Sequence, residues 1–230
     1  MNFPRPASIT HRVALAVAAV AAVVALCGAP AAQAAGPVAV SAITLSAPGG
    51  FIGDSTPLSL TDGPFSGDGI KLAPGDGSAI GSWMLPGEYI SFAGNAIQLR
   101  INAGQTSDAG DLVTGWLGAG ATHALYDFTG LSVGGDSVAS FSTSLIGGTG
   151  STPGLGSLVH LTSPSALTVD LDTLVFNPAN CNGTSECYVE FRIDLAASTT
   201  PPVPEPGTIP LMLAGGALVA AAVRRRRRAR

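Results

Sequence analysis

The sequence predicts an all-β domain, an antiparallel β-sandwich or jelly roll, with a signal helix before it and a transmembrane helix after it. Short apolar runs and alternating stretches are broken throughout by Gly, Pro, Asp and Ser, which is typical of many short strands. No segment between the termini sustains the 3.6-residue period of a helix. Finally, one long, mostly apolar stretch stands near each end of the 230-residue chain.

The N-terminus has the order of a secretory signal peptide. Arg5 and Arg12 form a basic opening, residues 13–26 are unbroken apolar, and the Ala-Gln-Ala of residues 32–34 fits the small-x-small cleavage pattern. We therefore expect the export machinery to translocate the chain and signal peptidase to cut it after residue 34. A retained anchor is the alternative, but a spanning helix needs roughly 20 apolar residues.

The C-terminus holds three elements in a fixed order. A short motif comes first, a nearly wholly apolar stretch follows to residue 223, and a basic cluster comes next. The motif is Val203, Pro204, Glu205 and Pro206, and the cluster is Arg224, Arg225, Arg226, Arg227 and Arg228. A helix over residues 209–223 would be about 22 Å long, against about 30 Å of bilayer core. The arginines keep their end of the helix in the cytoplasm, so the body must lie on the other side of the inner membrane.

This tail resembles the PEP-CTERM sorting signal of Gram-negative bacteria, and the resemblance is limited to residues 203–230. It implies transient anchoring in the inner membrane, then recognition and cleavage near the motif by an exosortase, a membrane protease-transpeptidase. It also implies delivery to the cell surface or extracellular matrix, usually in bacteria that make exopolysaccharide. An ordinary tail anchor is the alternative, although a plain anchor does not need Pro-Glu-Pro before it.

These signals divide the chain into a signal peptide (1–34), an exported all-β domain (35–197), a Pro/Thr-rich spacer (198–202) and the sorting signal (203–230). The exported domain holds three basic and fourteen acidic side chains, so its formal charge is 3 − 14 = −11. Such an acidic body repels nucleic acid and anionic lipid. We therefore expect no nucleic-acid partner.

The clearest strand covers residues 187–195, where apolar side chains at odd positions alternate with polar ones. We expect it to form a hairpin with residues 168–176, with Arg192 across from Asp170 or Asp172. Further strands are predicted over residues 38–46, 58–61, 69–72, 88–92, 96–101, 112–116, 122–128, 137–146 and 157–162.

Cys181 and Cys187 are the two cysteines that remain after signal removal. Because an exported protein enters an oxidising compartment, we predict a structural disulfide between them. A metal or redox pair is the alternative, but the spacing is not Cys-x-x-Cys and no histidine lies near.

The sequence contains no evident catalytic constellation, and we predict no catalytic residue, no metal site and no cofactor. The Gly-Asp-Ser blocks at residues 53–55 and 135–137 resemble the nucleophile block of GDSL-type esterases, but the late Asp-x-x-His of those enzymes is missing. We interpret both blocks as turns. Asp-Gly pairs at 62–63, 68–69 and 76–77 leave calcium open as an alternative, although their spacing matches no calcium loop.

The body is interpreted as a non-enzymatic structural or adhesive protein. A carbohydrate-binding module is the alternative, in which Trp83 and Trp116, with Tyr89 and Tyr126, would stack on exopolysaccharide. A secreted hydrolase is a third interpretation, which would need a serine or a carboxylate pair in a cleft.

Overall fold

The computed structural model describes residues 36–106, 110–148, 154–177, 179, 181, 187–198 and 224–226. The described body is built almost wholly of antiparallel strands, which confirms the predicted all-β class. The helices predicted over the signal peptide and over residues 209–223 lie outside the described residues. Within the described residues no helix has the length and apolar character needed to cross a bilayer.

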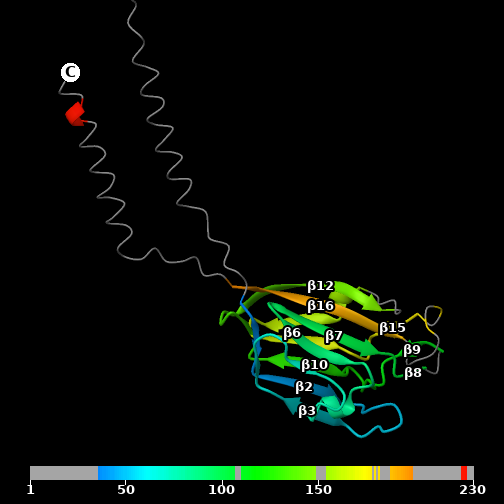
Figure 1. Ribbon diagram of the computed structural model, residues 1–230. Helices are drawn as coiled ribbons and strands as arrows, with labels where there is room; N and C mark the ends of the chain where they lie inside the picture. The colour runs from blue at the N-terminus through cyan, green and yellow to red at the C-terminus, as the bar shows by residue number, and fades with distance from the viewer. Residues whose placement is uncertain are drawn as a thin grey trace, which may run out of the picture. The chain divides into compact units, whose positions relative to one another are not determined.

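Two five-stranded sheets form the body, and Figure 1 shows them as two stacked layers in a sandwich-like arrangement. The first sheet has the order β13 (Val159–Ser163), β14 (Ala166–Asp170), β10 (Leu125–Thr129), β2 (Ala42–Ala47) and β3 (Leu58–Asp62). The second has the order β12 (Val138–Gly148), β16 (Tyr188–Ala197), β7 (Ala96–Asn102), β6 (Tyr89–Ala93) and β5 (Lys71–Leu72).

Short pieces complete the described body. One three-stranded sheet has the order β11 (Ser132–Val133), β1 (Val38–Val40) and β4 (Phe65–Ser66). Another has the order β15 (Val175–Phe176), β9 (Leu112–Val113) and β8 (Gln105–Thr106). Two single-turn 3-10 helices are η1 (Gly81–Trp83) and η2 (Leu155–Ser157).

The inward side chains of both large sheets belong to one hydrophobic core. Strand alternation produces it, since every second residue of a strand faces the same way. The buried members from the central strands are Ile43, Leu45, Ile97, Leu99, Tyr126, Phe128, Leu167, Val169, Val189, Phe191, Ile193 and Leu195. Burying each large apolar side chain contributes roughly 1.5–3 kcal/mol, so this shared core holds the two sheets together.

Strand β16 confirms the predicted alternation of residues 187–195, because the odd-numbered residues of this range are buried and the even-numbered ones are partly exposed. Its predicted partner was wrong. Strand β16 pairs with β12 and β7, whereas β14 pairs with β10 and β13 in the other sheet. Alternation fixes which face of a strand is buried, but not which strand lies beside it.

The predicted ion pair across that hairpin is also wrong. Arg192 lies between Ser144 and Gln98 of the neighbouring strands, and its Nε donates to Asp194 Oδ1 of its own strand at 2.7 Å.

The predicted continuous strand over residues 168–176 is wrong as well, because it divides into β14 and β15. Leu171 and Leu174 are both buried at the two ends of a turn, where Leu174 N–H donates to the Leu171 carbonyl. Two inward leucines three residues apart do not fit a period of two, so the chain turns between them.

Candidate functional site

The sorting signal follows the body after the short spacer of residues 198–202. Strand β16 ends at Ala197, and the N–H of Ser198 donates to the carbonyl oxygen of Ser137 at 2.7 Å. The motif at residues 203–206 lies outside the described residues, as do Arg227 and Arg228. Residues 224–226 are helical and exposed. A cluster of arginines next to an apolar stretch suits a position on the cytoplasmic side of a membrane.

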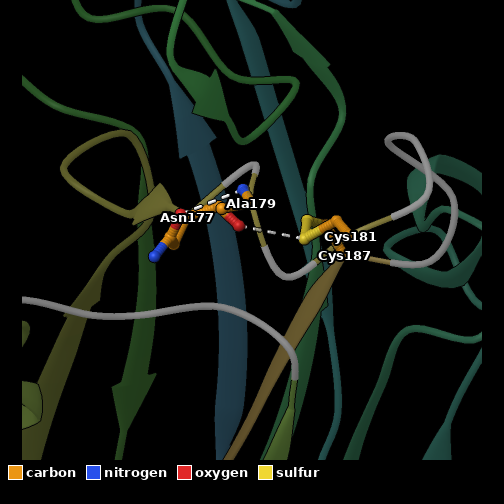
Figure 2. The surroundings of a disulfide bond; sticks show 4 residues. All are labelled: Asn177, Ala179, Cys181 and Cys187. Atoms are coloured by element: carbon orange, nitrogen blue, oxygen red, sulfur yellow. Dashed lines mark hydrogen bonds between the residues drawn. A yellow bond between two sulfur atoms is a disulfide. The ribbon is translucent and has the colours of Figure 1, made fainter.

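The predicted disulfide between Cys181 and Cys187 is present, with 5.3 Å between the two Cα atoms. Figure 2 shows it beside Asn177, whose Oδ1 accepts a hydrogen bond from the N–H of Ala179 at 3.0 Å. The Cys181 sulfur lies 3.3 Å from the carbonyl oxygen of Asn177. Cys187 is buried and immediately precedes β16, so the disulfide fastens the entry to this central strand.

The structure brings Trp83 and Trp116 together with Phe51, and we call these three residues the aromatic cluster. The two indole centroids lie 6.3 Å apart with 36° between the rings, so they do not form one flat platform. The Phe51 ring meets Trp116 edge-on at 5.4 Å and Trp83 at 6.4 Å. A Cβ at Gly115 would strike the Phe51 ring, so the close approach requires glycine there.

The two tryptophans of this cluster differ in exposure. Trp116 is 7% exposed and Trp83 is 36% exposed, so only Trp83 offers an indole surface to solvent.

The two tyrosines considered with them lie in other surroundings. Tyr126 is buried in the core. Tyr89 stands on β6, where its hydroxyl donates to Glu190 Oε1 at 2.6 Å and the Lys71 ammonium lies 4.3 Å from its ring centre. Burial, together with the hydrogen bond to Glu190, raises the pKa of Tyr89 to about 12.

Each histidine of the body lies beside an aspartate. His123 Nδ1 lies 2.9 Å from Asp172 Oδ2, and His160 Nε2 lies 3.7 Å from Asp170 Oδ2. The hydrogen bond to Asp172, followed by the charge of that carboxylate, raises the pKa of His123. A Cβ at Gly118 would come within 2.6 Å of Asp172 Oδ2, so this glycine makes room for the pair.

The Gly-Asp-Ser blocks lie in tight turns. Phe51 and Asp54 exchange backbone hydrogen bonds around one turn, and Val133 and Asp136 do so around the other. The Asp54 carboxylate also accepts the N–H of Thr56 at 3.0 Å. These contacts fit the turn interpretation of both blocks.

Three carboxylates of the Asp-Gly pairs bind nearby backbone. Asp62 accepts the N–H groups of Ala79 and Ile80 at 3.0 and 2.7 Å. Asp76 accepts those of Ala73 and Ser78, each at 2.8 Å. Asp68 accepts the N–H of Gly94. Within the described residues no three His, Cys, Asp or Glu side chains gather to hold a metal ion.

Sequence reasoning missed Glu88, a carboxylate that is only 7% exposed. Its two oxygens accept the N–H groups of Asn102 at 2.9 Å and Leu85 at 2.8 Å. Burial raises the pKa of Glu88 to about 7, although these two donors oppose the shift. The spacing of Glu88 from Ile90 and Phe92 could have predicted its burial. Residues two apart in a strand share a face, and both Ile90 and Phe92 are buried on β6.

Comparison with known proteins identifies the tail. Residues 202–228 match the family described as the PEP-CTERM protein-sorting motif, which confirms the resemblance expected from the sequence. This motif indicates an exported surface protein that an exosortase processes. No curated protein and no solved structure matches this chain.

Proposed function

We propose that this chain is the precursor of a cell-surface or extracellular-matrix protein, and that its β body has a structural or adhesive role rather than a catalytic one. The match of residues 202–228 to the sorting motif carries the proposal for delivery. In the proposed sequence of events, signal peptidase removes residues 1–34 and the apolar stretch lodges briefly in the inner membrane. An exosortase then cuts near Pro204-Glu205-Pro206.

The physical properties of the tail suit a temporary anchor. An apolar helix over residues 209–223 would be about 22 Å long, and it reaches through about 30 Å of hydrocarbon only if its flanking arginines extend their side chains to the interface. Cleavage at the motif removes this helix together with the arginines. The protein then delivered is the body with formal charge 3 − 14 = −11.

The contacts of the candidate chemical groups support a structural role. The carboxylates of Asp62 and Asp76 accept backbone N–H groups, and Asp172 binds His123. The disulfide fastens the chain entering β16, as suits a domain that works outside the cell.

Replacing Glu205 with Ala tests the sorting proposal in cells that contain an exosortase. We expect the variant to accumulate as a membrane-bound form that keeps the apolar helix and the arginines. Asp136→Ala is the matched control, since it removes one carboxylate from an exposed turn of the body, and it should be processed as the wild type is. Unchanged processing of Glu205→Ala would argue for an ordinary tail anchor.

The aromatic cluster favours carbohydrate binding as a second candidate. Trp83 is partly exposed and packs against Phe51 and Trp116, so its indole is held in place before any ligand binds. A sugar ring could stack on such a surface. The test is sedimentation of the exported protein with exopolysaccharide purified from the producing cells.

We expect Trp83→Ala to lose that co-sedimentation while it still unfolds in one cooperative transition. Its melting temperature should fall somewhat, because the indole also packs against Phe51 and Trp116. Tyr188→Ala is the aromatic control: it removes a partly exposed ring on β16 that packs against Arg100. Equal binding by wild type and Trp83→Ala would exclude the aromatic cluster as the sugar site.

A further inference from the structure

Strand β12 forms an open sheet edge, and its composition lacks the residues that usually prevent an edge strand from pairing with another chain. It pairs with β16 on one side and stands at the end of its sheet (Figure 1). Among the described residues, the Val138 N–H donates to Pro164, and residues 139–148 make backbone hydrogen bonds only within the pair with β16. Such an edge presents free N–H and C=O groups that can bind another extended chain.

The other sheet edges differ from β12 in length and charge. Strand β5 has two residues and includes Lys71, β3 has five and ends at Asp62, and β13 has five and includes His160. Strand β12 runs for 11 residues without a charged side chain or a proline. Natural proteins usually protect edges with charge, proline, shortness or β-bulges. Strand β12 lacks the first three, and its two irregularities leave a regular segment over residues 140–145.

Side chains on the core side of β12 are incompletely covered. Phe141, Thr143 and Leu145 lie opposite Leu195, Ile193 and Phe191 of β16, all of which are buried. Leu145 is nevertheless 56% exposed, and its neighbour Ile146 is 48% exposed. The sandwich therefore ends before it covers this part of its own inner face.

The sequence of β12 suits pairing with itself. Ser142, Thr143 and Ser144 stand between Phe141 and Leu145, so the segment has the same pattern in both directions. An antiparallel copy centred on Thr143 would place Phe141 opposite Leu145 of the partner, and Ser142 opposite Ser144. Each exposed leucine would then be covered by a phenylalanine of the other copy.

Two irregularities in the ladder limit the register of this pairing. The register with β16 shifts between Val138 and Ser140 and again between Leu145 and Gly147. A pairing centred on Thr143 uses only the regular segment between these shifts, whereas a slip of two residues along the strand would carry one end past a bulge.

From these observations we infer that the body forms a two-fold dimer by antiparallel pairing of β12 with β12 of a second copy, centred on Thr143. The two five-stranded sheets then join into one continuous sheet across the two-fold axis. This assembly adds to the proposed function and does not depend on sorting. Because each body carries a formal charge of 3 − 14 = −11, salt should strengthen the dimer by screening the repulsion.

A single cysteine at the two-fold axis tests the dimer directly. In Thr143→Cys the two new side chains lie opposite each other, with Cβ atoms about 4.5–5.5 Å apart, which is close enough for a disulfide after small adjustments. We expect the exported protein to run mainly as a covalent dimer on a non-reducing gel. Ser140→Cys is the matched control on the same strand, because its copies would lie about 20 Å apart.

A second variant separates specific pairing from random oxidation. Ser142→Lys with Ser144→Lys, added to Thr143→Cys, places like charges opposite each other, and both positions are exposed so the fold should persist. We expect this variant to lose the covalent dimer while it keeps its melting temperature. Three results would overturn the inference: a monomeric Thr143→Cys, equal cross-linking of Ser140→Cys, or a disulfide from position 143 to an unrelated protein.

Discussion

The buried carboxylate of Glu88 should make the stability of this protein depend on pH, and Glu88→Gln isolates its contribution. Burial raises the pKa of Glu88 from 4.5 to about 7 in the folded protein. Below pH 4.5 the group is neutral in both the folded and the unfolded chain. As the pH rises from 4.5 to 7, the folded protein holds a proton that the unfolded chain releases, so the free energy of unfolding falls.

The size of the effect follows from the two pKa values. Each tenfold change in proton affinity corresponds to about 1.4 kcal/mol. The difference between about 7 and 4.5 therefore removes about 3 kcal/mol from the free energy of unfolding by pH 8. Glutamine does not ionise, so the variant lacks this loss. It does place an amide N–H₂ near one of the two backbone donors, which costs about 1–3 kcal/mol at every pH.

The assay is urea unfolding of wild type and Glu88→Gln at several pH values from 4 to 8. The variant should be clearly less stable than the wild type at pH 4. Between pH 4 and pH 8 the difference in free energy of unfolding, variant minus wild type, should rise by about 3 kcal/mol. Taking the difference removes the contribution of every other group that titrates in both proteins. Asp136→Asn, in an exposed turn of the body, controls for the loss of a carboxylate. A gap that stays constant from pH 4 to 8 would refute the raised pKa.

Three further outcomes can be measured on the same protein. Replacing Cys181 and Cys187 together with Ala should lower the free energy of unfolding by about 2 kcal/mol, because the disulfide closes a loop of seven residues. The melting temperature should fall by roughly 4–8 °C, and an unchanged melting temperature would contradict this prediction. Because the pKa of His123 is raised in the folded protein, its pair with Asp172 stabilises the fold fully below pH 6.5 and less as the pH rises through the folded pKa. If the free energy of unfolding of His123→Gln depends on pH as that of the wild type does, the pair does not stabilise the fold. Calcium and a chelator should give the same melting curve, because backbone donors occupy Asp62 and Asp76; a rise in melting temperature with calcium would reveal a site.

The sequence predicted what depends on local pattern. The odd-numbered residues of 187–195 are buried because alternation sets the face of a strand wherever it lies in the sheet. The disulfide followed from the number of cysteines and the oxidising compartment. The sorting signal could be recognised because its three elements are contiguous in the chain.

Features that depend on contacts between distant segments were not predicted. The partners of β16 come from residues 96–102 and 138–148, and no local pattern specifies them. The sequence suggested that Trp83 and Trp116 act together, but not that Phe51, from a third segment, joins them while the tyrosines lie elsewhere. Glu88 was missed because charged side chains are rarely buried, so the sequence alone favours an exposed position.

The intact mass of the protein recovered from the cell surface or medium tests the central claim most directly. If the chain is exported and sorted as proposed, the mass should correspond to a polypeptide that begins at Ala35 and ends near Pro204-Glu205-Pro206, with any surface attachment adding mass at that end. It should also be two hydrogens short of the reduced chain, because of the single disulfide. A mass that includes residues 207–230, or a chain that still begins at Met1, would contradict the account.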